Sequence, residues 1–182
     1  RKSLIDDFNA VVCACGSLNV QTVVVPLVDN GALTSEREEN YLIDVLADHE
    51  TMLVANGVKI AFESDFAPIA LERFIGKMNP SLFGINYDIG NSASLGFNVN
   101  EEFAGYGARI LNVHVKDRPL GGTTVPLGEG DADFESVFSK LSECDYKGNY
   151  ILQTARDPSG QHRKVIQDYL EQTINWISEH ES

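Results

Sequence analysis

Basic residues are scarce in this chain, because 14 lysines and arginines stand against 27 aspartates and glutamates, for a net charge of −13. A nucleic-acid-binding surface needs a basic stripe, and attachment to an anionic membrane needs basic residues too, so this charge argues against both. No apolar run approaches the roughly 20 residues that span a bilayer, and no signal-peptide pattern is present. The composition is otherwise that of one globular domain, 43% hydrophobic and 23% charged.

Cysteine is scarce too, and an initial methionine is absent. The three cysteines, Cys13, Cys15 and Cys144, are an odd number, and the Cys-x-Cys pair falls inside a helical pattern. Reduced thiols in the core are therefore favoured over a disulfide or a metal site, and we expect a cytoplasmic protein. The chain opens on Arg1 and runs directly into a helical pattern, which indicates either N-terminal processing or a fragment.

Two patterns alternate along the chain. Near-continuous apolar runs, typical of parallel strands buried on both faces, occupy residues 20–27, 58–64, 83–88, 110–116 and 149–154. Helical patterns occupy residues 3–18, 35–57, 68–78, 100–107, 133–144 and 162–180. Ser35 is a plausible N-cap and Gly57 a plausible stop for the second of these. The alternation predicts an α/β fold with a parallel sheet, and the absence of Gly-x-Gly-x-x-Gly after any strand disfavours a dinucleotide site.

Polar side chains stand near the ends of four successive predicted strands. They are a carboxylate, a second carboxylate, an imidazole and an amide: Glu63, Asp88, His114 and Gln153. Reacting groups in parallel βα architectures gather at the C-terminal ends of the strands. Two carboxylates with one imidazole suit a divalent ion such as Mn²⁺, Mg²⁺, Co²⁺ or Zn²⁺.

Each of these residues also has a simpler explanation. Taken alone, a histidine near a strand end is more often a hydrogen-bonded structural residue, an aspartate before Ile-Gly-Asn is a turn former, and Glu63 is solvated. The run from Lys116 to Arg118 is either a solvated loop or a source of ligand support and anion binding. Arg156 and the glycine-rich residues 121–130, interpreted as a long functional loop, are candidates for the same anion binding. Phosphate sites in barrels often use the last two loops.

Four segments together resemble a known superfamily: "YDIGNSASLGF" (87–97), "NVHVKDR" (112–118), "VPLGEGDADFESVF" (125–138) and "YKGNYILQTARD" (146–157). They look like the sugar-phosphate isomerase/epimerase superfamily, which has a xylose-isomerase-like TIM barrel. Within it the chain is most similar to the group of L-ribulose/L-xylulose-5-phosphate 3-epimerases and hexulose-6-phosphate epimerases. The resemblance covers about residues 55–178 well and residues 1–54 weakly.

The resemblance implies a (β/α)8 barrel of which this chain carries a part. Family members have eight βα units, and the five predicted strands resemble the fourth to the eighth. We therefore expect residues 1–182 to be a single domain, a partial barrel without its N-terminal units. An open five-stranded sheet leaves edges and an unfilled interior, so its stability would depend on a partner that closes it.

The resemblance also implies a metal-dependent sugar or sugar-phosphate isomerase or epimerase that removes a proton next to a carbonyl through an enediolate. Glu63 matches a glutamate that binds the metal and acts as acid/base, and Asp88 and His114 match two further metal ligands. Gln153 falls where the epimerases usually carry a second glutamate, both ligand and acid/base. Four more residues are expected to contact the substrate or its phosphate: Asn91, Lys116, Arg118 and Arg156.

Gln153 departs from the family pattern. An amide can offer its carbonyl oxygen to a metal but cannot accept a proton, whereas two-base epimerisation needs two titratable groups. The departure shifts the prediction toward one-base aldose–ketose isomerisation, or toward a lyase or dehydratase-like relative. The alternative is a catalytically impaired relative that binds a sugar without turnover.

The expected partner is a small sugar or sugar phosphate, with no nucleic acid and no membrane. Phosphodiester cleavage, as in DNA-repair endonucleases of related fold, is disfavoured because the four histidines supply too few ligands and the acidic surface would repel DNA. The sequence leaves open whether the full-length protein forms a homo-oligomer.

Overall fold

The computed structural model describes residues 2–180 and contains all five predicted strands. The strands are β1 (Thr22–Leu27), β2 (Lys59–Ser64), β3 (Phe83–Asp88), β4 (Ile110–Val115) and β5 (Asn149–Leu152). The α-helices are α1 (Lys2–Ser17), α2 (Glu36–Ala47), α3 (Glu50–Asn56), α4 (Pro68–Gly76), α5 (Ile89–Leu95), α6 (Val99–Tyr106), α7 (Phe134–Glu143) and α8 (His162–His180). Two 3-10 turns, η1 (Asp29–Gly31) and η2 (Gly107–Arg109), follow β1 and precede β4.

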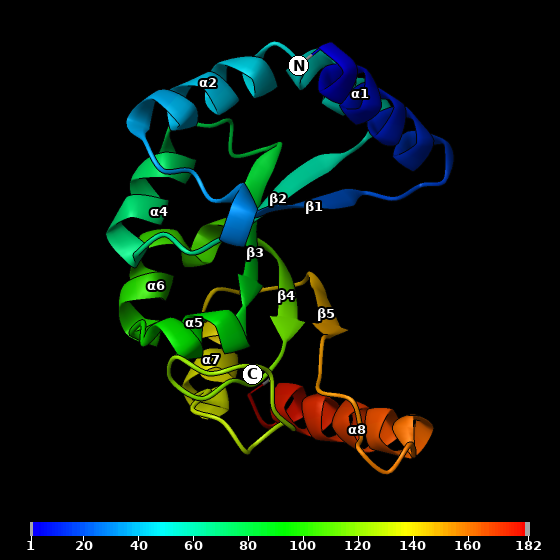
Figure 1. Ribbon diagram of the computed structural model, residues 1–182, viewed down its shortest axis with the longest axis vertical. Coiled ribbons are helices and arrows are strands. Elements are labelled where there is room, and N and C mark those ends of the chain that lie inside the picture. The colour runs from blue at the N-terminus through cyan, green and yellow to red at the C-terminus, as the bar shows by residue number, and fades with distance from the viewer. Residues whose placement is uncertain (1, 181–182) are drawn as a thin grey trace.

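The strands form one sheet in chain order, β1-β2-β3-β4-β5, and every neighbouring pair is parallel. This confirms the predicted α/β class. Figure 1 shows the sheet as a curved arc, with α2, α4 and α6 along one side; on the opposite side α1 lies at the upper end and α8 at the lower end, with no helix between them in that view. A parallel sheet covered by helices on its convex side only is part of a barrel wall.

The core lies between the outer face of the sheet and the helices. Phe62 of β2 is fully buried and packs edge-on against Phe74 of α4, with the ring centroids 5.4 Å apart. Alternate residues of β2, β3 and β4 point the same way and are buried as well: Ile60, Ile85, Tyr87, Val113 and Val115. These β-branched and aromatic residues explain why the segments form strands and why the helices dock on this face.

The inner face of the central strands is polar. Asn86 of β3 and Asn112 of β4 are neighbours there, and both are buried. A register shift between Ile85 and Asn86 inserts Leu111 as an extra residue in β4. Bulges of this kind re-aim the residues that follow. The shift pairs Asn112 with Asn86 and His114 with Asp88, so both end on the inner face.

Three local predictions need correction. Residues 35–57 form two helices, α2 and α3, because the chain turns at Asp48 and His49, both weak helix formers, and the His49 ring bonds the Val45 carbonyl at 2.6 Å. Helix α5 was not predicted, and only Asp88 before it was considered, as a possible turn former. Cys13 and Cys144 are free as expected but exposed rather than in the core.

The predicted helix boundaries at Ser35 and Gly57 are confirmed. The Ser35 hydroxyl accepts the N–H of Glu38, and Gly57 takes the left-handed conformation that ends α3, with φ of 64°. Both residues act as their chemistry dictates.

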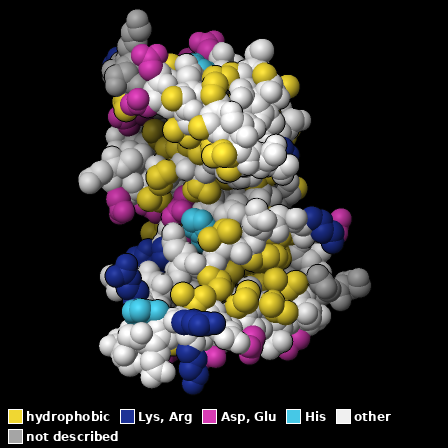
Figure 2. Space-filling model, turned by 90° about the vertical axis from the view of Figure 1, so that its right-hand side faces the viewer, with side chains coloured by type: hydrophobic (Ala, Val, Ile, Leu, Met, Phe, Trp, Pro, Cys, Tyr) yellow, Lys and Arg dark blue, Asp and Glu magenta, His cyan; other side chains and the backbone are white. Residues whose placement is uncertain are grey.

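Apolar side chains remain exposed beside the open side of the sheet. Figure 2 views the molecule from the right-hand side of Figure 1 and shows hydrophobic side chains gathered in its upper and lower halves. The exposed apolar residues of the chain include three at four-residue spacing on α8, Ile166, Leu170 and Ile174, and Ile151 of β5. No helix within residues 2–180 is both long and apolar enough to cross a membrane.

Candidate metal centre

Three side chains from three neighbouring strands meet on the inner face. Glu63, Asp88 and His114 each offer one ligand atom, and these atoms lie within 4.8 Å of one another. His114 Nδ1 is 3.4 Å from Glu63 Oε2 and 3.6 Å from Asp88 Oδ2. The side chains of Glu63 and His114 are 12% exposed and that of Asp88 is 2% exposed, so the cluster is largely shielded from water.

Asp88 has a structural role as well as a place among the convergent side chains. As the N-cap of α5, its Oδ1 accepts the backbone N–H of Asn91 at 2.8 Å. This leaves Oδ2 directed at His114 and Lys116, whose Nζ donates to it at 3.2 Å. The residue therefore both starts a helix and supplies an oxygen to the cluster.

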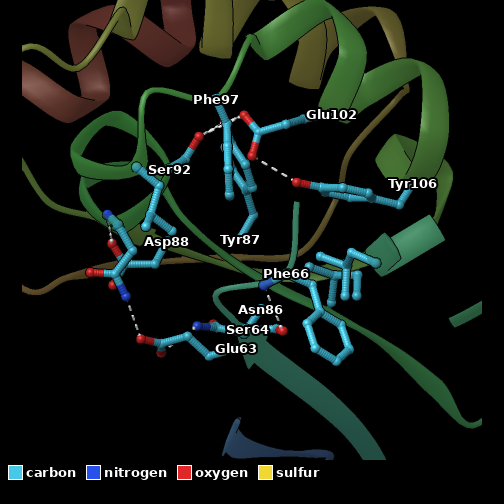
Figure 3. A pocket seen from close by; sticks show the side chains of 14 residues that line it. Glu63, Ser64, Phe66, Asn86, Tyr87, Asp88, Ser92, Phe97, Glu102 and Tyr106 are labelled. Atoms are coloured by element: carbon cyan, nitrogen blue, oxygen red, sulfur yellow. Dashed lines mark hydrogen bonds between the residues drawn. The ribbon is translucent and has the colours of Figure 1, made fainter. Parts of the chain in front are cut away.

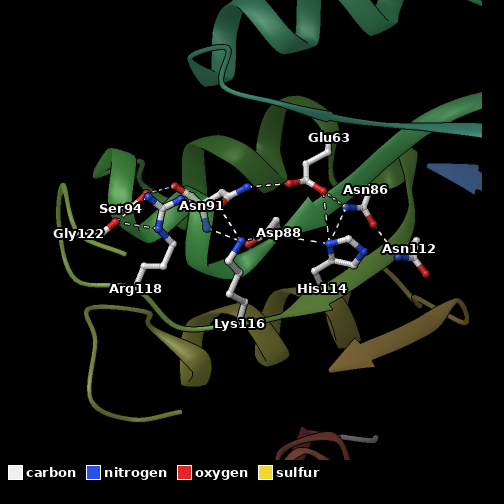
Figure 4. A network of polar contacts seen from close by, with 10 residues as sticks. All are labelled: Glu63, Asn86, Asp88, Asn91, Ser94, Asn112, His114, Lys116, Arg118 and Gly122. Carbon is white, nitrogen blue, oxygen red and sulfur yellow. Dashed lines mark hydrogen bonds and ion pairs between the residues drawn. The ribbon is translucent and has the colours of Figure 1, made fainter. Parts of the chain in front are cut away.

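Amide side chains hold Glu63 in place (Figure 4). Asn91 Nδ2 donates to Glu63 Oε1 at 2.8 Å and Asn86 Nδ2 donates to Oε2 at 3.0 Å. Asn112 Nδ2 in turn donates to Asn86 Oδ1 at 2.6 Å. Each carboxylate oxygen accepts one amide hydrogen bond, and Oε2 also faces His114 Nδ1 at 3.4 Å, so a second lone pair remains on Oε1 for a cation or a proton.

Two cations flank the carboxylates. Lys116 Nζ and Arg118 Nη1 both donate to Asn91 Oδ1, at 3.0 and 2.7 Å, and the Arg118 guanidinium also bonds the Gly122 carbonyl. Asn91 thus links the cations to Glu63, because its oxygen faces the cations and its nitrogen faces the carboxylate. The structure places Lys116 and Arg118 beside the cluster rather than in a solvated loop.

The charges of the cluster act most clearly on His114. Burial lowers the pKa of the imidazole, but its interactions with Asp88 and then with Glu63 outweigh burial and raise the pKa to about 9. The ring is therefore cationic at neutral pH in the metal-free protein, where it helps to neutralise two carboxylates. A metal ligand must be neutral imidazole, so a bound cation would take the place of that proton.

The donor set fits a divalent metal. Ligands at 2.0 to 2.2 Å from one ion lie at most about 4.4 Å apart, and the three candidate atoms are near that spacing. Two carboxylates and one imidazole are ligands that Mn²⁺, Mg²⁺, Co²⁺ and Zn²⁺ all accept. Among residues 2–180, this is the one group of three or more histidine, cysteine or acidic side chains that meets the spacing.

Gln153 and Arg156 are not joined to this network. Gln153 follows the end of β5, where its backbone N–H donates to the Val115 carbonyl at 3.0 Å and its side chain is exposed. Arg156 is exposed too, beside a surface cavity of about 270 Å³. Within the described residues no side-chain hydrogen bond or ion pair connects either one to the three convergent residues, so their predicted roles stay predictions.

Sequence reasoning did not identify Asn86 or Asn112 as parts of the site. A signal was present, because each lies two residues before a predicted ligand, Asp88 and His114 respectively. Side chains two apart on a strand share a face, so a polar residue at that spacing points to the same interior.

Solved structures of TIM-barrel proteins share this fold. The IolI protein crystallised with a zinc atom superposes with a TM-score of 0.83 at 22% identity, covering 100% of this chain and 71% of that one. A xylose isomerase domain protein from Planctomyces limnophilus gives a TM-score of 0.82 at 19% identity, covering 98% of this chain and 67% of that one.

Curated relatives are similar over different lengths. An inosose dehydratase of Geobacillus kaustophilus (strain HTA426) is 25% identical over 196 residues, which cover 92% of this chain and 64% of the relative. The L-ribulose-5-phosphate 3-epimerase UlaE of Salmonella paratyphi C (strain RKS4594) is 36% identical over 93 residues, covering 48% of this chain and 33% of the relative. This chain therefore spans less than two thirds of the length of these relatives.

The model of one family matches almost the whole sequence, residues 1–180. The parallel sheet, the convergent side chains at its C-terminal edge and this match agree with the resemblance seen in the sequence. The chain belongs to the xylose isomerase-like TIM barrel family.

Proposed function

We propose that this protein is a metal-dependent sugar or sugar-phosphate isomerase or epimerase that removes a proton from a carbon next to a carbonyl. The observation that carries the proposal is the convergence of Glu63, Asp88 and His114 within 4.8 Å at one edge of the sheet. Relatives named as an L-ribulose-5-phosphate 3-epimerase and as an inosose dehydratase support this class of chemistry.

Glu63, Asp88 and His114 would hold the metal, and the carbonyl oxygen of Gln153 is the proposed fourth ligand. A divalent ion bound there supplies Lewis-acid stabilisation of the negative charge that develops on the substrate oxygens. Lys116 stands 3.2 Å from Asp88 and adds a fixed positive charge on the same side.

Glu63 is the proposed base. Asn86 and Asn91 hold one oxygen each, which fixes the direction of the carboxylate without using all of its lone pairs. A base that is already oriented loses little entropy when it removes a proton from a bound substrate.

The substrate would lie between this edge and the positive groups. Lys116 and Arg118 are directed at Asn91 Oδ1, the side from which an anionic group or a sugar hydroxyl would approach. Arg156, on the loop after β5, is the proposed further contact for a phosphate, because it is exposed and unengaged with the cluster.

Gln153 bears on whether the proposed reaction is a one-base isomerisation or a two-base epimerisation. Its amide cannot accept a proton, so one-base isomerisation with Glu63 is favoured over two-base epimerisation. The same residue supports a second candidate function, a relative that binds a sugar without turnover. Metal analysis of the purified protein separates the two, since stoichiometric metal supports catalysis and sugar binding without metal supports the second candidate.

The direct test is turnover of a panel of sugars and sugar phosphates by the full-length protein before and after EDTA treatment, and by Glu63→Gln. We expect EDTA to abolish turnover, added Mn²⁺ to restore it, and Glu63→Gln to lower kcat by roughly 10²-fold or more. Glu72→Gln, an exposed glutamate of α4, is the matched control and should leave turnover unchanged. Activity that survives both EDTA and Glu63→Gln would exclude the mechanism.

A further inference from the structure

A buried acid lies behind the candidate site, on the other face of β3. The carboxylate of Glu102 in α6 is 1% exposed and accepts hydrogen bonds from three hydroxyl groups (Figure 3). Tyr87 Oη and Ser92 Oγ donate to Oε2 at 2.8 and 2.6 Å, and Tyr106 Oη donates to Oε1 at 2.7 Å. Both oxygens are therefore fixed by residues from three different elements.

Glu102 is a costly residue to bury. Burial raises its pKa against the opposing effect of the three hydroxyl donors, and within the described residues no lysine or arginine is paired with it. An apolar side chain of similar size would often be as stable in such a place. The location of the three donors indicates what the carboxylate does.

Two of the donors flank the turn that carries the site. Tyr87 directly precedes Asp88 at the end of β3, and Ser92 directly follows Asn91 in the first turn of α5. Between them, Asp88 caps Asn91, and the Asn91 amide holds Glu63. Glu102 thus binds the residue before this turn and the residue after it with a single oxygen.

Packing alone does not fix this turn. A cavity of about 20 Å³, room for roughly one water molecule, borders Asp88, Asn91, Ser92 and Glu102. The side chains that line it lack close neighbours on that side, so hydrogen bonds must supply the restraint that contacts supply elsewhere in the core.

We propose that Glu102 is a positioning residue, whose bonds to Tyr87 and Ser92 set the orientation of Asp88 and Asn91 toward Glu63. This inference rests on the metal site under "Proposed function". It assigns Glu102 no contact with metal or substrate.

The test compares the wild-type protein with Glu102→Leu, Glu102→Gln and Val137→Ala. Leucine removes every acceptor, glutamine restores one acceptor oxygen, and Val137→Ala is a control that weakens the core at α7 without lining the cavity beside the turn. The readouts are amide hydrogen exchange of residues 89–95 and the Kd for Mn²⁺ by calorimetry.

We expect Glu102→Leu to speed exchange in residues 89–95 and to weaken Mn²⁺ binding, each by roughly tenfold or more, with Glu102→Gln in between. Val137→Ala should lower the Tm without either effect. The inference is overturned if Glu102→Leu changes exchange and Kd no more than Val137→Ala does. If the leucine variant does not fold, the inference is overturned when Glu102→Gln has the same exchange rates and the same Kd as the wild-type protein.

The two readouts, hydrogen exchange and the Kd for Mn²⁺, test the two proposals separately. A wild-type protein that binds no Mn²⁺ refutes the metal site, yet the exchange of residues 89–95 still decides whether Glu102 holds the turn. Wild-type binding with an unchanged Glu102→Leu refutes the positioning role and leaves the metal site standing.

Discussion

Asp117 anchors the long loop between β4 and α7, and replacing it should release that loop while the sheet stays folded. The residue is fully buried. Its Oδ2 accepts the backbone N–H groups of Gly128 and Gly130 at 2.8 and 2.9 Å, and its Oδ1 accepts that of Ala132 at 3.2 Å. Its own carbonyl accepts the N–H of Val125 at 3.0 Å, so one residue fixes the loop at four points.

The size of the effect follows from those bonds. A hydrogen bond to a charged acceptor contributes about 1.5–3 kcal/mol, so the three side-chain bonds together set an upper limit of roughly 5–9 kcal/mol. Asp117→Asn can keep its oxygen on Gly128 and Gly130 but turns an N–H₂ toward Ala132, so we expect a loss of about 2–4 kcal/mol. Gly128 is exposed, and water can satisfy the freed N–H groups once the loop opens.

The loss should therefore appear as local opening. Asp117→Asn is expected to speed hydrogen exchange in residues 118–132 and cleavage after Glu129 by a glutamate-specific protease, each by roughly 30-fold or more, while exchange in β2 and β3 stays slow. Asp145→Asn is the control, since Asp145 is 84% exposed and pairs only with the exposed Lys147 among the salt bridges of the described residues. Wild-type exchange and cleavage in Asp117→Asn would refute the assignment of the loop to this carboxylate.

Three further outcomes follow from the structure. NMR titration of the metal-free protein should give His114 a pKa of about 9, and Asp88→Asn should lower that pKa. Because the pKa lies above the ordinary 6.5, the stability that His114 contributes is present below about pH 6.5 and is lost as the pH rises through 9. Urea unfolding at pH 6 and at pH 10 measures that loss. Lys116→Met should tighten Mn²⁺ binding roughly tenfold in calorimetry, because a positive charge 3.2 Å from Asp88 repels the ion, and weaker binding would contradict this. Gly57→Ala should lower stability by about 1 kcal/mol through its φ of 64° alone, since a Cβ there meets no atom within 4 Å, and an unchanged Tm would contradict the strain argument.

The sequence was informative where burial determines the pattern. All five strands were predicted, because residues packed under helices on the outer face must be apolar, as Phe62, Ile85 and Val113 are. Helix α5 was missed because it is only seven residues long and rich in small and polar residues, a composition that favours turns in isolation. Its helical state comes from the Asp88 cap, which is a local contact, and from the hydrogen bond of Ser92 to Glu102 of α6.

The site was predictable in part for a related reason. Strand ends of a parallel sheet meet at one edge, which is enough to bring Glu63, Asp88 and His114 together. The residues that hold them were predictable only in part: the two-residue spacing puts Asn112 on the same face as His114, but the β-bulge in β4 decides that Asn112 meets Asn86. A bulge leaves no reliable mark in one sequence.

The register also bears on Gln153, whose role is the least tested part of the proposal. Continuing the β2–β3 register by one residue places Glu63 beside Asn86, two residues before Asp88. Asp88 pairs directly with His114. His114 pairs with Ile151, two residues before Gln153.

By this register, Asp88 lies two residues further along than Glu63, His114 lies level with Asp88, and Gln153 lies two residues further along than His114. An eight-stranded barrel with a shear of eight steps by one residue per strand on average, so this line follows one layer around the barrel wall. Continuing the β4–β5 register one residue past Leu152 puts Gln153 on the same face, and we expect Gln153→Glu to add a carboxylate at the same level. We expect tighter Mn²⁺ binding and a gain of 3-epimerase turnover in that variant; unchanged Kd and turnover would show that the side chain does not reach the site.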